Sequence, residues 1–362
     1  MNLRYKRVVI KVGSNVIARG DGMVDFTRMS AIVDQVALLH KAGVEVVLVS
    51  SGAVACGKGE MKGFSTKLDS VESRQLFSAV GQAKLINRYY ELFREHGIVC
   101  GQVLTTKESF STRRHYINQQ GCMGVMLQNG VIPIVNENDT VSVTELMFTD
   151  NDELSGLISS MMDAEALIIL SNIDGIFNGN PADEKSSVIA KILPENRDLS
   201  QYIMSGKSQF GRGGMLSKTN IATKVADEGI EVIVANGKRD NIIVDIIDSQ
   251  SNVVCTRFVP VSKNISGIKK WISHSQGFAK GGVVINSGAY EALLSSGATS
   301  LLTVGIVRVT GSFEKDDIVA IFLESGEHIG VGKVAYDSEK AMELIGVKGV
   351  KPIIHYDYLY LD

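Results

Sequence analysis

Amide and carboxylate side chains gather at the end of one apolar run in this sequence. The run Val131–Val135 is followed directly by Asn136–Asp139 (Asn-Glu-Asn-Asp) and, after a short spacer, by Asp150–Asp152 (Asp-Asn-Asp). In open α/β sheets, ligands bind just outside the carboxyl ends of the strands. We therefore expect these groups to bind a polar, charged small molecule. Each of them taken alone is more typical of a turn former that hydrogen-bonds its own backbone.

Lys11 brings a positive charge into a second apolar run, Val8–Val12. A lysine there must either extend its amine to the surface or meet an anion. Gly13 and Ser14 follow at once, and small residues let backbone amides approach a phosphate. The combination favours a phosphate-binding role, with surface extension of the lysine as the alternative.

A second lysine ends a glycine-rich segment. The run Gly211–Lys218 (Gly-Arg-Gly-Gly-Met-Leu-Ser-Lys) leads into a predicted helix. The free amides at the start of a helix attract anions, and Lys218 adds a point charge. The segment predicts a phosphate contact, and a flexible loop without function is the alternative.

Small or turn-forming residues end two further apolar runs. Val46–Ser50 leads into Ser51–Ala53, and Ala166–Leu170 leads into the turn-rich segment Ser171–Pro181. The latter segment taken alone is more typical of an ordinary loop. Because a parallel sheet gathers its strand ends on one edge, together these ends indicate a site that holds a charged small molecule against a phosphate donor.

Two lysines and an aspartate suit the transfer of a phosphoryl group to a carboxylate. Donor and acceptor are then both anions, and unit charges about 4 Å apart repel by roughly 4 kcal/mol at an effective dielectric of about 20. Cations beside the migrating group must offset that repulsion. The acceptor carboxylate, with a usual pKa of about 4.3, is already ionised at neutral pH. No general base is needed, so positioning and charge stabilisation can carry the reaction.

Such a site needs a sheet that brings distant strand ends together. Over the first two-thirds of the chain, apolar runs alternate with helical periodicity, which favours a parallel sheet covered on both faces. The predicted fold class is α/β, a three-layer α/β/α sandwich with a largely parallel central sheet. Predicted strands lie near 8–12, 44–49, 98–104, 131–135, 166–170 and 231–235, and predicted helices near 29–39, 71–95, 113–128, 152–162 and 216–227.

The alternation breaks between Val259 and Gly277, which we interpret as a linker between a domain of residues 1–258 and one of residues 278–362. Beyond the linker, glycines separate short β-rich runs near 281–285, 305–309, 318–322 and 329–334. This pattern predicts a small β-rich domain with one or two helices.

The composition is that of an ordinary soluble globular protein. The chain has 362 residues, of which 44% are hydrophobic, and its net charge of −3 gives no overall attraction for nucleic acid. The cysteines and histidines show no metal-binding spacing, which predicts no metal site of the protein's own and suits a reducing cytoplasm. Since no signal peptide and no run long enough to span a bilayer are present, we expect a cytoplasmic protein without membrane contact.

Six segments in order resemble the amino acid kinase family, and among its members the glutamate kinases that carry a C-terminal PUA domain. The segments are Val9–Ser14, Ser51–Ala53, Ala79–Gln82, Asn136–Asp139, Asp150–Asp152 and Gly213–Lys218. Each is short, but six in the same order over essentially the whole chain are specific.

The resemblance implies ATP-dependent phosphorylation of the γ-carboxylate of L-glutamate, which gives L-glutamyl 5-phosphate and begins proline biosynthesis. The lysines Lys11 and Lys218 would stabilise the migrating phosphoryl group, and Asp152 would hold both lysines. The implied glutamate-binding residues are Ser51, Gly52, Ala53, Asn136, Asp139 and Asn151. The implied nucleotide-binding residues are Lys11, Gly13, Ser14, Ser171, Asn172, Arg212, Gly213, Gly214, Met215, Leu216, Ser217 and Lys218. Mg²⁺ would arrive mainly with ATP.

Two positions depart from the family pattern. Ser171-Asn172 stands where Thr-Asp is frequent, and Arg212 stands where a small hydroxyl residue is common. The resemblance also implies proline as a feedback inhibitor that acts at Glu72–Gln82 and the glutamate loop. It further implies glutamyl phosphate reductase as a partner and a homo-oligomer, either a dimer or a tetramer.

Two other functions stay open at this point. Related kinases act on N-acetylglutamate, aspartate, carbamate or UMP, but Asp139, a natural partner for an α-ammonium group, would oppose an uncharged acetyl amide. PUA domains also occur in RNA-modifying enzymes. Residues 278–362 carry seven Lys and Arg against eleven Asp and Glu, a net charge of −4. Affinity for a phosphate backbone needs the opposite sign, so we do not expect nucleic acid as the main ligand.

Overall fold

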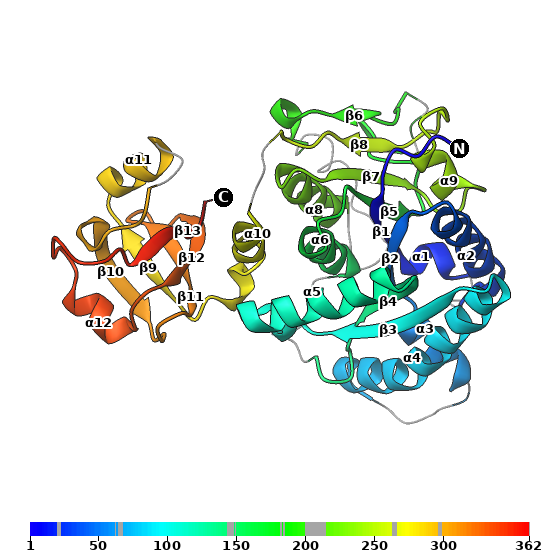
Figure 1. The fold of residues 1–362 in the computed structure, drawn as a ribbon, viewed down its shortest axis with the longest axis horizontal. Helices are drawn as coiled ribbons and strands as arrows, with labels where there is room; N and C mark the ends of the chain where they lie inside the picture. Colours follow the sequence, from blue (N-terminus) through cyan, green and yellow to red (C-terminus); the bar gives the residue numbers. More distant parts are fainter. Residues whose placement is uncertain are drawn as a thin grey trace. The chain divides into compact units, whose positions relative to one another are not determined.

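The chain divides into two compact units (Figure 1). The computed structural model describes residues 1–19, 23–61, 63, 68–142, 148, 150–181, 183, 185–199, 215–262, 266–295 and 299–361. Unit 1 comprises Met1–Ser109 and Ile117–Asn264, and unit 2 comprises Phe110–Tyr116 and Ile265–Asp362. A short segment from the first half of the chain therefore belongs to the C-terminal unit.

Unit 1 is built on an eight-stranded sheet with the strand order β3-β4-β2-β1-β5-β7-β8-β6. The strands are β1 (Arg7–Val12), β2 (Glu45–Ser50), β3 (Val99–Thr105), β4 (Val131–Glu137), β5 (Ala166–Ser171), β6 (Lys191–Ile192), β7 (Glu231–Asn236) and β8 (Thr256–Phe258). Neighbouring strands pair in parallel, except that β7 and β8 are antiparallel. The prediction of a largely parallel sheet is confirmed.

Helices cover both faces of this sheet (Figure 1). One face shares a hydrophobic core with α1 (Ser14–Ile17), α2 (Phe26–Lys41), α3 (Ala53–Glu60), α4 (Ser70–Glu95) and α9 (Ile242–Ile247). The other face carries α5 (Arg113–Gln128), α6 (Asn151–Met161) and α8 (Met215–Asp227). The short 3₁₀ helices η1 (Lys107–Phe110) and η2 (Pro194–Asn196) lie in the connections. The three-layer α/β/α prediction is therefore also confirmed.

The alternation of side chains along β1 decides which layer Lys11 faces. Successive side chains of a strand point to opposite faces of the sheet. Ile10 and Val12 are buried in the core that contains α2 and α4, so Lys11 points to the opposite face, which α6 covers. It lies level with Val49 of β2 and Ile169 of β5 in the middle of the sheet, and only 5% of its surface is exposed.

An acidic cap fixes the start of the helix that follows the amide-rich segment. Asp150 precedes α6, and its Oδ1 accepts hydrogen bonds from the backbone N–H groups of Asp152 and Glu153 at 2.9 and 3.1 Å. Such a cap satisfies amides that have no partner within the helix. Asp152 is thereby held on the first turn of α6.

Unit 2 contains a five-stranded sheet with the order β10-β9-β11-β12-β13. Its strands are β9 (Gly281–Ile285), β10 (Ile306–Gly311), β11 (Ile318–Leu323), β12 (His328–Val334) and β13 (Ile354–Leu361). Its helical elements are α10 (Gly267–Ser273), α11 (Ser287–Ser295), α12 (Ser338–Glu343), η3 (Gln276–Phe278) and η4 (Thr303–Gly305). The prediction of a small β-rich domain is confirmed, and β13 adds a strand that the glycine pattern does not indicate.

Helix α10 lies within residues 259–277, the segment interpreted from the sequence as a linker. Trp271 of this helix is 2% exposed, and its indole Nε1 donates a hydrogen bond of 2.9 Å to the carbonyl of Phe110. Phe110 and Tyr116 are also buried. Residues 110–116 and α10 thus both belong to unit 2, to which they contribute the buried side chains of Phe110, Tyr116 and Trp271.

Among the helices of the described residues, none combines the length and the apolar character that crossing a lipid bilayer requires.

Candidate active site

Lys11 and Lys218 meet at a single carboxylate. Lys218 Nζ donates a hydrogen bond of 2.7 Å to Asp152 Oδ2, and Lys11 Nζ forms an ion pair of 2.7 Å with Asp152 Oδ1. Asp152 is completely buried, and both lysine side chains are at least 89% buried. The three side chains come from β1, α6 and α8, and their summed formal charge is positive.

The two lysines determine the ionisation of Asp152. Burial alone would raise the pKa of this carboxyl group, because a low-dielectric environment disfavours charge. The charges of Lys11 and Lys218 outweigh burial and hold the pKa below its usual range. Asp152 is therefore a carboxylate at neutral pH and is not available as a general acid.

A contact between the first turns of α6 and α8 holds Lys218 in place. Ser217, on the first turn of α8, donates a hydrogen bond of 2.8 Å from its hydroxyl to Asp150 Oδ2. Asp150 caps α6 with its other oxygen, so one side chain ties α8 to α6. This contact places Lys218 beside Asp152. Sequence reasoning treated Asp150 only as part of a motif and did not foresee this double role.

Glycine at position 13 leaves space beside Lys11. A Cβ atom on Gly13 would lie 3.5 Å from Lys11 Nζ and 3.1 Å from the carbonyl oxygen of Leu170. Ser14, the next residue, begins α1 and is exposed. A small anionic group can approach the Lys11 ammonium across this glycine.

A second group of side chains, all of them neutral, adjoins the lysines through α6. Asn151 Nδ2 donates hydrogen bonds to Ser51 Oγ at 2.9 Å and to Asn136 Oδ1 at 3.1 Å. Asn136 Nδ2 in turn donates to Gln82 Oε1 at 2.8 Å. Asn151 and Asp152 are consecutive on the first turn of α6, so this amide cluster (Ser51, Gln82, Asn136 and Asn151) lies next to the charged group.

Gly52 and Ala53 turn the chain from β2 into α3. Gly52 has φ +116°, a conformation that side chains rarely adopt, and a Cβ atom there would come within 2.9 Å of Ile17 Cδ1. Ala53 begins α3 and is buried. α3 packs so closely on α4 that a Cβ atom on Gly81 would overlap the Ala53 carbonyl. Gly81 belongs to the motif Ala79–Gln82, which thereby positions this turn.

Asp139 lies in a third group, together with Glu137 and two residues of α4. Arg74 Nε donates to Asp139 Oδ1 at 2.7 Å and Arg74 Nη2 donates to Glu137 Oε2 at 2.8 Å. Ser78 Oγ donates to Asp139 Oδ2 at 2.9 Å. Both acidic side chains are at least 91% buried. One oxygen of the Asp139 carboxylate therefore meets a cationic donor, and the other meets a neutral hydroxyl.

From the sequence, Arg74, Ser78 and Gln82 were placed within the segment Glu72–Gln82 implied for proline inhibition, and none of them was given a contact of its own. These residues recur at intervals of four on α4, and residues at that spacing share one face of a helix. The start of α4 is marked by Asp69 and Glu72, which form a capping box. Polar residues at intervals of four after a recognisable capping box were thus the signal in the sequence.

The expected nucleotide-binding residues are only partly within the described residues. Ser171 is buried at the end of β5, and its hydroxyl lies 3.4 Å from Asn172 Oδ1, while Asn172 is exposed. Met215, Leu216 and Ser217 form the first turn of α8. Arg212, Gly213 and Gly214 lie outside the described residues.

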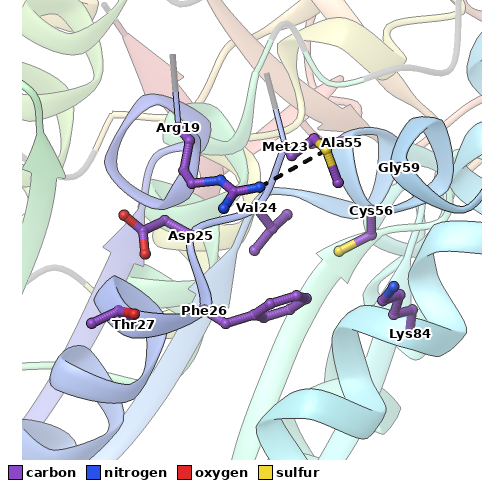
Figure 2. Close-up of a pocket in the computed structure, with 10 residues that line it drawn as sticks. All are labelled: Arg19, Met23, Val24, Asp25, Phe26, Thr27, Ala55, Cys56, Gly59 and Lys84. Atoms are coloured by element: carbon purple, nitrogen blue, oxygen red, sulfur yellow. Dashed lines mark hydrogen bonds between the residues drawn. The ribbon is translucent and has the colours of Figure 1, made fainter. Parts of the chain in front are cut away.

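A separate pocket of about 270 Å³ is formed by residues just before and at the start of α2 and by residues of α3 and α4 (Figure 2). Its Cys56 thiol has a pKa raised to about 11 by burial, so it stays protonated at neutral pH. Lys84 pairs with Glu60 and lies 5.9 Å from the centre of the Phe26 ring. The groups seen in this pocket offer no nucleophile or free base.

Comparison with known proteins agrees with the resemblance. Residues 6–236 match the model of the amino acid kinase family, and residues 281–356 match that of the PUA domain. The chain is 65% identical over 362 residues to a glutamate 5-kinase of Bacteroides thetaiotaomicron, with 100% of both chains covered. It is 48% identical over 358 residues to a glutamate 5-kinase of Chlorobaculum tepidum, covering 99% of this chain and 98% of that protein. A glutamate 5-kinase of Neisseria meningitidis is 36% identical over 98% of this chain and 96% of its own length.

Proposed function

The chain belongs to the amino acid kinase family, and we propose that it transfers the γ-phosphoryl group of ATP to the γ-carboxylate of L-glutamate. The product is L-glutamyl 5-phosphate, and the reaction is the first step of proline biosynthesis. The observation that carries this proposal is the pair of ammonium groups on Asp152, next to the amide cluster on the same helix turn.

Lys11 and Lys218 stabilise the charge of the migrating phosphoryl group. Two anions must approach one another in this reaction, and preorganised cations in a water-poor site reduce that repulsion most effectively. Asp152 fixes both ammonium groups, and because one carboxylate faces two cations, the three side chains keep a net charge of +1. The γ-carboxylate is already ionised, so no residue has to remove a proton.

The amide cluster and its neighbours bind glutamate in this proposal. Ser51, Asn136 and Asn151 supply hydroxyl and amide groups that can hold a carboxylate, and the turn at Gly52 and Ala53 supplies backbone N–H groups. Asp139 pairs with the α-ammonium group, which an acetylated substrate lacks. Glutamate is therefore favoured over N-acetylglutamate as the acceptor.

ATP is assigned to the side of the two lysines that lies away from the amide cluster. Gly13, Ser14, Ser171, Asn172 and the segment Arg212–Lys218 are the proposed contacts. Mg²⁺ bound to the phosphates supplies further charge neutralisation. Asp152 is already held at both oxygens by lysines, and the described part of the chain contains no group of three or more His, Cys, Asp or Glu side chains that could hold a metal ion. In this proposal Mg²⁺ is held mainly by the nucleotide.

The proposal also covers inhibition by proline, a partner enzyme, the oligomeric state and the cellular compartment. Proline, a shorter amino acid that shares the α-carboxylate and a cationic nitrogen with glutamate, would compete at Asp139 and the Glu72–Gln82 segment. Glutamyl phosphate reductase would take up the reactive product, and the enzyme would be a dimer or tetramer in the cytoplasm. The cysteines Cys56, Cys100, Cys122 and Cys255 are all free.

An ADP-release assay with L-glutamate, N-acetylglutamate, aspartate, carbamate and UMP tests the proposed substrate. Trapping the acyl phosphate with hydroxylamine identifies the product as a γ-hydroxamate. We expect turnover with glutamate to exceed that with each other acceptor. Faster turnover of N-acetylglutamate, or ADP release without hydroxamate, would overturn the assignment.

A further inference from the structure

We infer that Arg74 is a positioning residue that keeps the Asp139 carboxylate charged and oriented, so that the site selects acceptors with an α-ammonium group. The inference rests on the proposed function, because it concerns how glutamate is recognised. Arg74 acts through Asp139 and is assigned no contact with the reacting atoms.

The geometry places one cation between two carboxylates. The guanidinium of Arg74 reaches Asp139 through Nε and Glu137 through Nη2, at 2.7 and 2.8 Å. Only 3% of the Glu137 side chain and 9% of the Asp139 side chain is exposed, whereas Arg74 is 24% exposed. The planar guanidinium can bridge two carboxylates at once, which a lysine ammonium does less rigidly.

The remaining contacts of the pair are neutral. Ser78 donates to Asp139, the backbone N–H of Phe148 donates to Glu137 Oε1 at 3.0 Å, and the intervening Asn138 N–H donates to Thr105 O. The side chain of Ser142 is a further neutral group beside Glu137, so the contacts of the described residues come from α4, from residues 142 and 148 and from β3. Arg74 is thus the cation that faces both carboxylates there.

Two like charges in a buried site cannot both stay ionised without a cation. Burial and the neighbouring charge of Asp139 raise the pKa of Glu137, and Arg74 counteracts them. Without Arg74 this counteracting charge is lost, so the pKa of Glu137 would rise further, and the two carboxyl groups, which both lie against the same guanidinium nitrogen, would share a proton. A protonated pair can no longer offer Asp139 as a full anion to an ammonium group.

The test is the pH dependence of KM for glutamate in the full-length enzyme. With Arg74→Met we expect KM to rise as the pH falls below the raised pKa of Glu137, by about tenfold per pH unit. The loss should fall more on KM than on kcat, because Lys11 and Lys218 are untouched. Arg74→Lys should restore most of the affinity and flatten the profile.

A double variant separates ionisation from mere structural support. In Arg74→Met/Glu137→Gln the second carboxylate is gone, so Asp139 should again ionise at low pH and the steep KM profile should disappear. A structural role for Arg74 alone would leave the double variant as impaired as the single one. Arg94→Met is the matched control, because it removes an exposed arginine from the same helix.

The outcomes distinguish the inference from the proposed function. If the parent enzyme phosphorylates glutamate and Arg74→Met shows a KM that does not depend on pH, the inference is overturned. The same holds if the double variant keeps the steep profile. If the parent enzyme releases no ADP with glutamate, the proposed function fails instead. Circular dichroism and thermal unfolding of each variant establish that it is folded.

Discussion

Lys11 and Lys218 stand near opposite ends of unit 1 in sequence, yet their ammonium groups lie at the two oxygens of the same carboxylate, each at 2.7 Å. Two cations this close would repel one another if Asp152 did not lie between them. The arrangement leaves one unit of positive charge for a further anion. It is this surplus that we assign to the migrating phosphoryl group.

Replacing either lysine should therefore slow the chemical step. We expect Lys11→Met and Lys218→Met to lower kcat by about 10²–10³, as removal of one preorganised charge stabiliser does. Steady-state ADP release measures the effect. Lys191→Met, which removes an exposed lysine from β6, is the control and should stay near the parent rate. Near-normal kcat in both active-site variants would refute the two-cation site.

Replacing Asp152 should destabilise the fold in a pH-dependent way. Removing one partner of a buried ion pair costs about 3–5 kcal/mol, so Asp152→Asn should lower the unfolding free energy at pH 7 by about that much. The pKa of Asp152 is lowered in the folded state, so its stabilising contribution is present above its unfolded pKa of about 3.9 and is lost as the pH falls through the folded value.

Urea unfolding at several pH values checks this sign. The difference between parent and Asp152→Asn should stay constant from about pH 7 to 5 and should narrow only below about pH 4. A difference that widens on acidification would show that another group, and not the Asp152 carboxylate, accounts for the loss.

Two glycine substitutions should have opposite effects on stability, because one glycine lies where α3 and α4 are in close contact and the other has free space around it. A methyl group on Gly81 would overlap backbone atoms of Ala53 and Gly57, so Gly81→Ala should cost about 1–3 kcal/mol and raise the KM for glutamate by displacing the Ser51–Ala53 turn. Gly121 of α5 has nothing within 4 Å of an added Cβ, so Gly121→Ala should stabilise by about 0.5–1 kcal/mol. Thermal unfolding and kinetics of the pair measure both; equal effects would contradict the packing argument.

Unit 2 should lose stability when a residue from the first half of the chain is truncated. Phe110 is 1% exposed and its carbonyl accepts the indole hydrogen bond of Trp271. Phe110→Ala should cost about 3–5 kcal/mol. Trp271 is the single tryptophan, so its fluorescence during urea unfolding reports on unit 2. Leu38→Ala, at a side chain 56% exposed on α2, is the control. If Phe110→Ala changes the free energy of unfolding no more than this control does, residues 110–116 do not support unit 2.

Local periodicity was sufficient for most of the elements. The predicted helices near 71–95 and 113–128 agree with α4 and α5 within a residue, and the strands near 131–135 and 166–170 correspond to β4 and β5. These segments are long or strongly apolar, so their own pattern decides their conformation. Helix α10 was missed, because seven residues rich in lysine show little periodicity and gain their order from Trp271 packing in unit 2.

The amino-acid sequence determined the kinds of group in the site: lysines near glycines that leave room for a phosphate, and amides and carboxylates after apolar strands. They also determined the fold class, since alternating apolar runs and amphipathic helices leave few ways to bury both. The partners were decided only by the tertiary structure. Lys11 meets Asp152, and Arg74 bridges Glu137 and Asp139, because strand order and helix docking join residues that are distant in sequence. A local sequence pattern shows to which side of its own strand or helix a side chain points. It does not show which side chain of another element lies opposite.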